Sequence, residues 1–177
     1  SLDSSLAYAR HFPAINWLTS YSLYVDSLKP WYDSQFGEQF MKNRTRAMSL
    51  LQEESSLQEI VKLVGQDALG AADRMTLETA KMIREDFLQQ NSFVDIDSYS
   101  ETERQYLLMA MILDFDVQAR AAINQGVELG KILNIPVREK IGRAKMIGEN
   151  EYETAYAAIR ETIDKELLAA VKQAEEL

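Results

Sequence analysis

Glycine and proline are scarce along this chain, which has seven glycines and three prolines among its 177 residues. Both residues interrupt helices, and a protein built from many short strands needs them in its turns. Most other positions hold strong helix formers such as alanine, leucine, glutamate, lysine, glutamine and methionine. Hydrophobic residues make up 46% of the chain, an ordinary value for a globular protein. The sequence therefore predicts an all-α fold, a multi-helix bundle.

Apolar periodicity and end signals divide the chain into expected elements. Residues 1–18 are weakly periodic and contain Pro13, so we expect them to be mostly extended, with a helical domain over residues 19–177. Capping patterns predict that helices begin at Ser55, Asp73, Ser100 and Asn150. The expected helices cover residues 19–28, 31–51, 57–64 (ended by Gly65), 73–87, 101–125, a short stretch after 128, a stretch from 137 to about 146, and a long stretch after 150.

The helix expected over residues 101–125 is the most apolar and should lie at the centre of the core. Two sets of residues are expected to form its buried side: a stripe of Tyr106, Ala110, Leu113, Val117 and Ala121, widened by Leu107, Leu108, Met111 and Ile112.

The formal net charge of −9 makes some classes of partner unfavourable. A negative surface repels phosphate backbones and anionic lipid, so we expect no nucleic-acid binding, and a basic partner is the better match. The apolar run over residues 106–113 is far shorter than the ~20 residues that span a bilayer, so we expect no membrane insertion. The absence of cysteine excludes disulfides and fits the cytoplasm.

The residues show no complete catalytic or metal site. His11 is the single histidine, and no nucleophile pattern surrounds it. The stretch 95–99 resembles the start of a calcium-binding loop, but Ser100 stands where glycine is needed and Tyr106 where glutamate is needed. No glycine-rich phosphate loop is present. The residues alone predict a non-catalytic helical module, and one hypothesis is a free-standing adaptor for protein–protein interaction.

Two segments carry a more specific resemblance. Residues 11–22 read HFPAINWLTSYS, and residues 87–93 read FLQQNSF, followed by Tyr99. Both are similar to segments of the catalytic A chain of V/A-type rotary ATPases, downstream of the nucleotide-binding core. Between them, residues 67–73, DALGAAD, occupy the place of an acidic loop in the related F-type β chain. The resemblance spans most of residues 1–125 and identifies the chain as the C-terminal helical domain of such a catalytic subunit.

The resemblance implies a role in holding adenine. In this family, aromatic side chains from two segments stack on the base of ATP, and Phe12 and Phe93 match those positions, with Tyr99 a third candidate. Pro13 would aim Phe12, and Ser92 would leave room beside Phe93. Each stacking contact contributes ~1–3 kcal/mol.

The resemblance also implies a mechanical role. The loop over residues 67–73 would form a tip that touches the rotating central stalk. With Asp67 and Asp73 as the loop's only charges, contact through Leu69 and the helix ends is expected rather than a strongly electrostatic push.

What the resemblance implies for the whole machine follows from these roles. ATP or ADP with Mg²⁺ would bind in the intact protein, within a hexamer of A and B subunits on the cytoplasmic face of a membrane, coupling ATP hydrolysis or synthesis to ion transport. The phosphate loop, the acid that holds Mg²⁺ and the catalytic glutamate belong upstream. We therefore expect this chain to be a piece of a longer protein, inactive and without a bound cofactor by itself.

Overall fold

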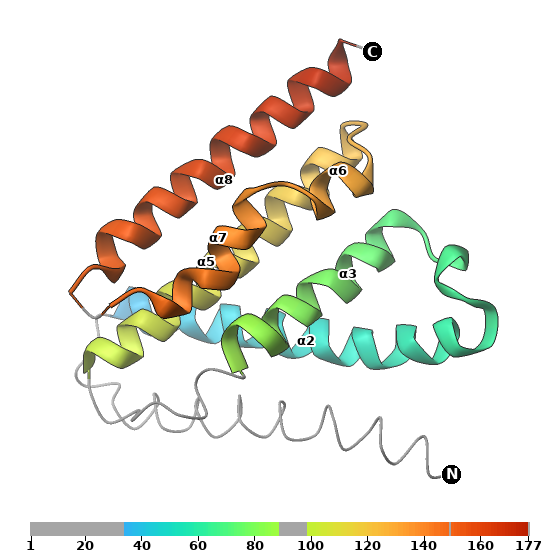
Figure 1. Cartoon of the computed structure of the whole chain (residues 1–177). Coiled ribbons are helices and arrows are strands. Elements are labelled where there is room, and N and C mark those ends of the chain that lie inside the picture. The colour runs from blue at the N-terminus through green and yellow to red at the C-terminus, as the bar shows by residue number, and fades with distance from the viewer. Residues whose placement is uncertain (1–33, 89–98, 149, 177) are drawn as a thin grey trace. The chain divides into compact units, whose positions relative to one another are not determined.

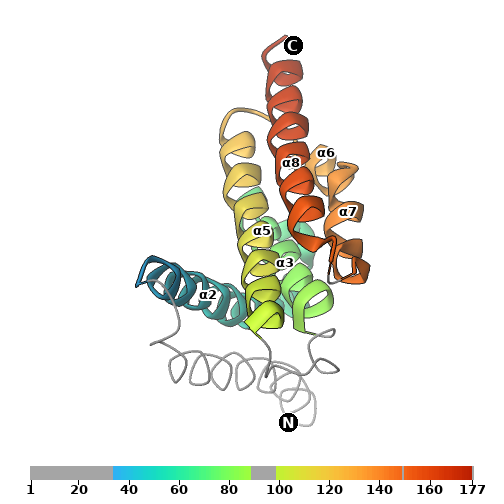
Figure 2. The same cartoon turned by 90° about the vertical axis from the view of Figure 1, so that its left-hand side faces the viewer.

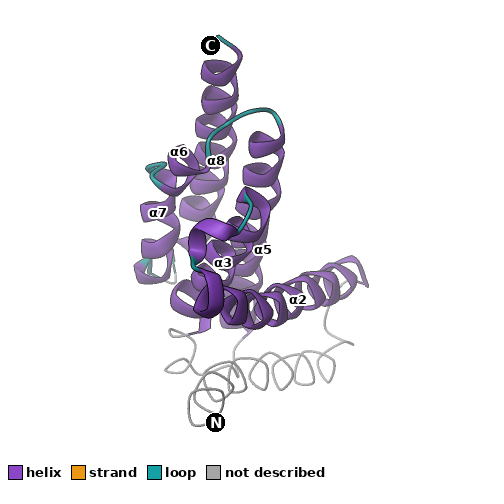
Figure 3. Ribbon diagram, turned by 90° about the vertical axis from the view of Figure 1, so that its right-hand side faces the viewer, coloured by secondary structure: helices purple, strands orange, loops and turns teal. Residues whose placement is uncertain are grey.

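A computed structural model describes the chain over residues 34–88, 99–148 and 150–176. Within these ranges every regular element is a helix and no strand occurs (Figures 1 and 3). The prediction of an all-α fold is confirmed. The expected extended segment 1–18 and the helix over 19–28 lie outside the described residues. In the part that is described, no helix is both long enough and apolar enough to cross a lipid bilayer.

The chain divides into two compact units, residues 1–69 and 70–177. The described part of the first unit consists of the long helix α2 (Ser34–Val64) and the 3₁₀ turn η2 (Gln66–Ala68). Gly65 ends α2 as predicted, with φ of 89°, a left-handed conformation that glycine adopts at little cost. Its amide donates to the carbonyl oxygen of Val61 at 2.9 Å.

A predicted break near Ser55 is wrong, because α2 continues through it. The buried side of α2 passes from Leu50 and Leu51 to Glu54 and Leu57, each three or four residues from the last. This spacing keeps one face of a single helix buried. Burial along a continuous face therefore outweighs the local preference of serine for a helix start.

The second unit consists of helices grouped around one central helix. In chain order its elements are α3 (Ala71–Met82), the π-helical turn η3 (Ile83–Leu88), α5 (Tyr99–Asn124), α6 (Leu129–Leu133), α7 (Val137–Arg143), the 3₁₀ turn η4 (Ala144–Met146) and α8 (Tyr152–Glu175). Both α3 and α8 pack against α5, and α7 packs against α8 (Figure 2). The central position predicted for the most apolar helix is confirmed.

The predicted buried side of α5 is only partly right. Leu108, Met111, Ile112 and Leu113 are buried, but Val117 is 63% exposed. Ala121 is also exposed, while Tyr106, Leu107 and Ala110 are half-buried. The fully enclosed positions continue instead through Phe115, Asp116, Ala119 and Ala122. Because Asp116 lies on the buried face, a stripe drawn from apolar residues alone followed a different face of the helix.

The final helix agrees with its predicted pattern. Its buried residues are Tyr152, Tyr156, Ile159, Ile163 and Leu167, which recur at helical spacing. The short helices after 128 and 136, separated by a turn at residues 134–136, are confirmed as well.

Three predicted helix starts are displaced. Gly70, not Asp73, is the N-cap of α3, and Asp73 lies in the first turn, where a carboxylate is favoured by the helix dipole. Ser100 lies inside α5, which begins at Tyr99. Glu151, not Asn150, is the N-cap of α8. The caps of α3 and α8 make no side-chain hydrogen bond, so backbone turns set where these two helices begin.

Candidate functional site

The residues predicted to contact adenine fall mainly outside the described part of the chain. Phe12, Pro13, Ser92 and Phe93 all lie there. Tyr99 is the first residue of α5, so its backbone is helical. The stacking role of these residues stays a prediction.

Two of the predicted stalk-contacting residues belong to the first unit. Asp67 lies in η2 and is exposed to solvent. Leu69 follows with an extended backbone and is half-buried, and its amide donates to the carbonyl oxygen of Gln66 at 3.1 Å. The third residue, Asp73, belongs to the second unit and is exposed in the first turn of α3.

Three large apolar side chains at the end of α2 are exposed, which the sequence prediction missed. Ile60 is 43% exposed, Leu63 84% and Val64 64%. The helix predicted over residues 57–64 contains the apolar residues Leu57, Ile60, Val61 and Val64, and of these Leu57 alone is buried. The sequence does hold a signal for this: apolar residues occupy several sides of the helix just before Gly65, and one buried face cannot cover them all.

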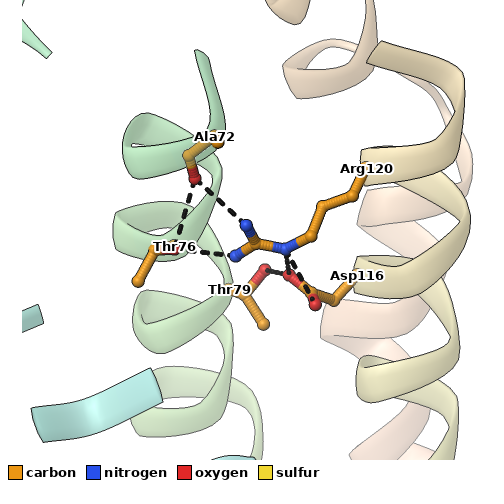
Figure 4. A network of polar contacts seen from close by, with 5 residues as sticks. All are labelled: Ala72, Thr76, Thr79, Asp116 and Arg120. Carbon is orange, nitrogen blue, oxygen red and sulfur yellow. Dashed lines mark hydrogen bonds and ion pairs between the residues drawn. The ribbon is translucent and has the colours of Figure 1, made fainter. Parts of the chain in front are cut away.

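A buried polar network joins α3 to α5 in the second unit (Figure 4). At its centre is Asp116, which is 1% exposed. The hydroxyl of Thr79 donates to the Oδ1 atom of Asp116 at 2.6 Å. Arg120, one turn further along α5, donates from Nε to both carboxylate oxygens at 3.0 and 3.1 Å. The carboxylate is thus paired and hydrogen-bonded, as a buried charge requires.

The same arginine reaches the first turns of α3. One terminal nitrogen of Arg120 donates to the carbonyl oxygen of Ala72 at 3.2 Å, and the other donates to the hydroxyl of Thr76 at 2.7 Å. Thr76 itself donates to that carbonyl oxygen at 3.2 Å. A single guanidinium therefore links the buried carboxylate of α5 to the beginning of α3 (Figure 4). The spacing of Asp116 and Arg120, four apart in the most apolar helix, could have revealed this pair in the sequence.

Two further arginines connect other elements of this unit. Arg138 of α7 donates to Glu78 of α3 at 2.8 Å and to the carbonyl oxygen of Leu133 at 2.8 Å. Arg104 of α5 donates to the hydroxyl of Tyr156 at 3.3 Å and to the carbonyl oxygen of Lys145. Polar contacts thus tie α3, α7 and α8 into one structure around α5.

Burial raises the pKa of three groups in the second unit. The carboxyl of Asp86 has its pKa raised by burial, although Lys145 acts in the opposite direction. The pKa of Glu103 is raised by burial and then by the nearby charge of Glu153. Burial also raises the pKa of the Tyr106 hydroxyl. The described residues hold no group of three or more histidine or acidic side chains that could hold a metal ion.

Over the described residues the chain is all-α, and hydrogen bonds and ion pairs connect its helices. Comparison with known families shows which class of protein it belongs to. A family model described as the C-terminal domain of V and A type ATP synthase matches residues 29–133, more than half of the chain. The chain belongs to this family. The resemblance identified in the sequence is confirmed, and it takes precedence over the adaptor hypothesis.

The similar curated proteins are long chains of which this one matches a part. The V-type ATP synthase alpha chain of Clostridioides difficile (strain 630) is 51% identical over 99% of this chain, which covers 30% of that protein. The V-type ATP synthase alpha chain 1 of Clostridium tetani is 55% identical over 85% of this chain and 25% of that protein. The A subunit of the A-type ATP synthase of Methanosphaera stadtmanae is 51% identical over 94% of this chain and 28% of that protein. The chain thus spans less than a third of the length of these relatives.

Proposed function

We propose that this chain is the C-terminal part of the catalytic A chain of a V/A-type ATP synthase or ATPase, where it couples nucleotide binding to rotation of a central stalk and to ion transport. The family match and the similarity to alpha chains and A subunits of ATP synthases support this proposal. The groups that bind phosphate and Mg²⁺ and cleave ATP would lie in the rest of that protein.

The observation that carries the proposal is the position of α3 in the chain. The helix begins directly after Gly70 of the tip loop and continues through η3 to Leu88. The next residues lead to Ser92 and Phe93, the predicted adenine contacts. At ~1.5 Å per residue this helical run is roughly 25 Å long. A stiff run of this kind would carry a displacement from one end to the other.

At the nucleotide end, Phe12, Phe93 and Tyr99 would stack on the adenine of ATP or ADP, with Pro13 and Ser92 shaping the backbone around the rings. The closed form of the domain would make more contacts with ATP than the open form. That difference in affinity would bias the angle of the stalk, since a ligand shifts an equilibrium only by its differential binding.

At the other end, Asp67, Leu69 and Asp73 would touch the central stalk. The last turn of α2, which precedes this loop in the chain, exposes Ile60, Leu63 and Val64. This supports an apolar contact at the tip rather than an electrostatic one. The intact protein would work beside B subunits in a hexamer, attached peripherally to the membrane on its cytoplasmic side.

The stacking role is tested by Phe93→Ala in the full-length protein. Nucleotide affinity should fall by about the ~1–3 kcal/mol of one stacked base, while the far-ultraviolet circular dichroism stays the same. Phe93→Tyr keeps the flat ring and should bind nucleotide as the unmodified protein does. Equal affinity in the alanine variant would show that Phe93 does not stack on adenine.

The division of labour is tested with the isolated chain. Because the phosphate contacts would lie elsewhere in the full-length protein, calorimetry should detect only very weak ATP binding by residues 1–177. Tight binding would contradict the proposal that this chain supplies only the adenine end of the pocket.

A further inference from the structure

We propose that Arg120 is the positioning residue that holds the beginning of α3 to the central helix α5. The inference rests on the proposed function and deepens it, because it names the contact through which a force on Asp73, in the first turn of α3, would reach the rest of the second unit.

Arg120 donates to a backbone carbonyl of α3 that does not need another hydrogen-bond donor. The carbonyl oxygen of Ala72 lies in the first turn of α3, and a helix already uses the carbonyls of its first turn in its own hydrogen bonds. The guanidinium adds a further donor to that oxygen at 3.2 Å, beside the hydroxyl of Thr76. Since no orphan acceptor requires this bond, its effect is to fix the position of the first turn against α5.

Net stability does not explain the network either. A buried ion pair is often no better for stability than apolar side chains of similar size, because both charges lose their water. The central helix α5 also packs against α8, whose buried stripe is mainly apolar. The arginine fixes the orientation of α3 relative to α5, because its planar guanidinium donates in fixed directions to Asp116, Ala72 and Thr76 at once.

The consequence is a joint that resists sliding. If α3 rotated or moved along its axis relative to α5, the bonds to the Ala72 carbonyl and the Thr76 hydroxyl would break, and the hydroxyl of Thr79 would leave Asp116. A force on the first turns of α3 would therefore move α3 and α5 together.

The experiment uses the full-length protein, assembled in its ATPase and reconstituted into vesicles. Arg120→Lys keeps a positive charge beside Asp116 but replaces the fork with one ammonium, which cannot hold Asp116, Ala72 and Thr76 together. The number of ions transported per ATP hydrolysed should fall, because movement of α3 would no longer be passed fully to α5. The KM for ATP and the melting temperature should stay close to those of the unmodified enzyme.

Two further variants control for charge and for general disturbance. Asp116→Asn/Arg120→Met removes both charges, so no buried charge is left unpaired, and it should lower the transport ratio as Arg120→Lys does. Arg143→Lys alters an exposed pair with Glu139 on α7, where both side chains are more than three-quarters exposed, and should leave the ratio unchanged.

Hydrogen exchange separates a local joint from a general loss of stability. In Arg120→Lys the amides of the first turns of α3, such as that of Arg74, whose acceptor is the Gly70 carbonyl, should exchange faster, while those of α8 keep their rates. A uniform rise throughout the second unit, with a lower melting temperature, would show a merely structural role and overturn the proposal.

A tip variant distinguishes failure of the joint from failure of the proposed function. Leu69→Asp places a charge at the expected stalk contact and should also lower the transport ratio. If Leu69→Asp lowers it but Arg120→Lys does not, the joint alone is refuted. If Leu69→Asp leaves the ratio unchanged, the mechanical role is refuted, and the joint with it.

Discussion

Two helices pack against α5 by different means. On one side, α3 meets it through a buried carboxylate, an arginine and two threonine hydroxyls. Against α8, by contrast, α5 meets a mainly apolar stripe. The polar contacts between these two helices are the part-buried bond from Arg104 to Tyr156 and exposed bonds such as that from Gln118 to Asp164. The apolar contact supplies stability without strong direction, whereas the polar network has few arrangements that satisfy every group. The polar network thus fixes the position of α3 against α5, whereas α8 is attached to α5 mainly by the burial of apolar side chains.

The largest effect is expected from removing the arginine of the polar contact. Arg120→Ala leaves Asp116, 1% exposed, with Thr79 but without its cation. Breaking a buried pair in this way costs about 3–5 kcal/mol, which urea unfolding of the chain can measure. Asp116→Asn/Arg120→Ala should recover most of the loss. A loss below ~1 kcal/mol would mean that the carboxylate finds another partner, and the contrast between the two contacts would disappear.

The apolar contact should respond to lost volume. Leu167→Ala removes a side chain that is 3% exposed and should cost about 2–5 kcal/mol in the same measurement. The next residue offers a matched control, because Leu168 is 55% exposed and its alanine variant should change stability far less. Equal losses at the two leucines would contradict the packing of α8 described above.

A smaller effect is expected at Asp86, near the far end of α3. Since burial raises its pKa in the folded chain, the folded state holds the proton more tightly than the unfolded chain does. Its contribution to stability is therefore greatest at acidic pH, and it is lost as pH rises from the ordinary pKa of 3.8 through the raised value. Asp86→Asn should unfold at a higher temperature at neutral pH, with a weaker dependence on pH. An unchanged pH dependence would show that burial does not disfavour the ionised carboxylate.

The smallest effect is expected at the solvent-exposed rim between α5 and α8. Asp164→Ala removes one of the two carboxylate acceptors of the Gln118 amide, at the exposed bond of 2.6 Å, and leaves Asp114 as the other. Water can replace that bond, so the free energy of unfolding should change by no more than ~1 kcal/mol. A larger loss would place part of the strength of the α5–α8 contact in its polar rim.

The sequence predicted most of the helices, because long apolar stripes such as that of α8 need no tertiary information. It failed where a local signal competed with burial. Ser55 resembles a helix start, yet the buried face of α2 continues past it to Leu57. It also failed on the face of α5, because Asp116 breaks the apolar pattern, and only the position of Thr79 on another helix shows that this acid is buried and satisfied.

Some features of the candidate site could also be predicted from the sequence and others could not. The surface positions of Asp67 and Asp73 follow from their charge, because carboxylates are rarely buried without a partner. The contacts of Arg120 with α3 could not be predicted, because they join residues 44 and 48 positions apart in the chain. The pairing depends on how α3 packs against α5, which no local pattern encodes.

The π-helical turn η3 (Ile83–Leu88) bears on how a related chain with one residue fewer in this turn would fold. A π turn holds about one residue more than an α turn, and each α-helical residue turns the chain by ~100°. Deleting one residue between Ile83 and Leu88 could therefore restore a regular α-helix while preserving the orientation of everything downstream. The same deletion within α3 itself would rotate Phe87, which is 1% exposed, out of the core. A one-residue deletion should therefore disturb the fold less in η3 than in α3.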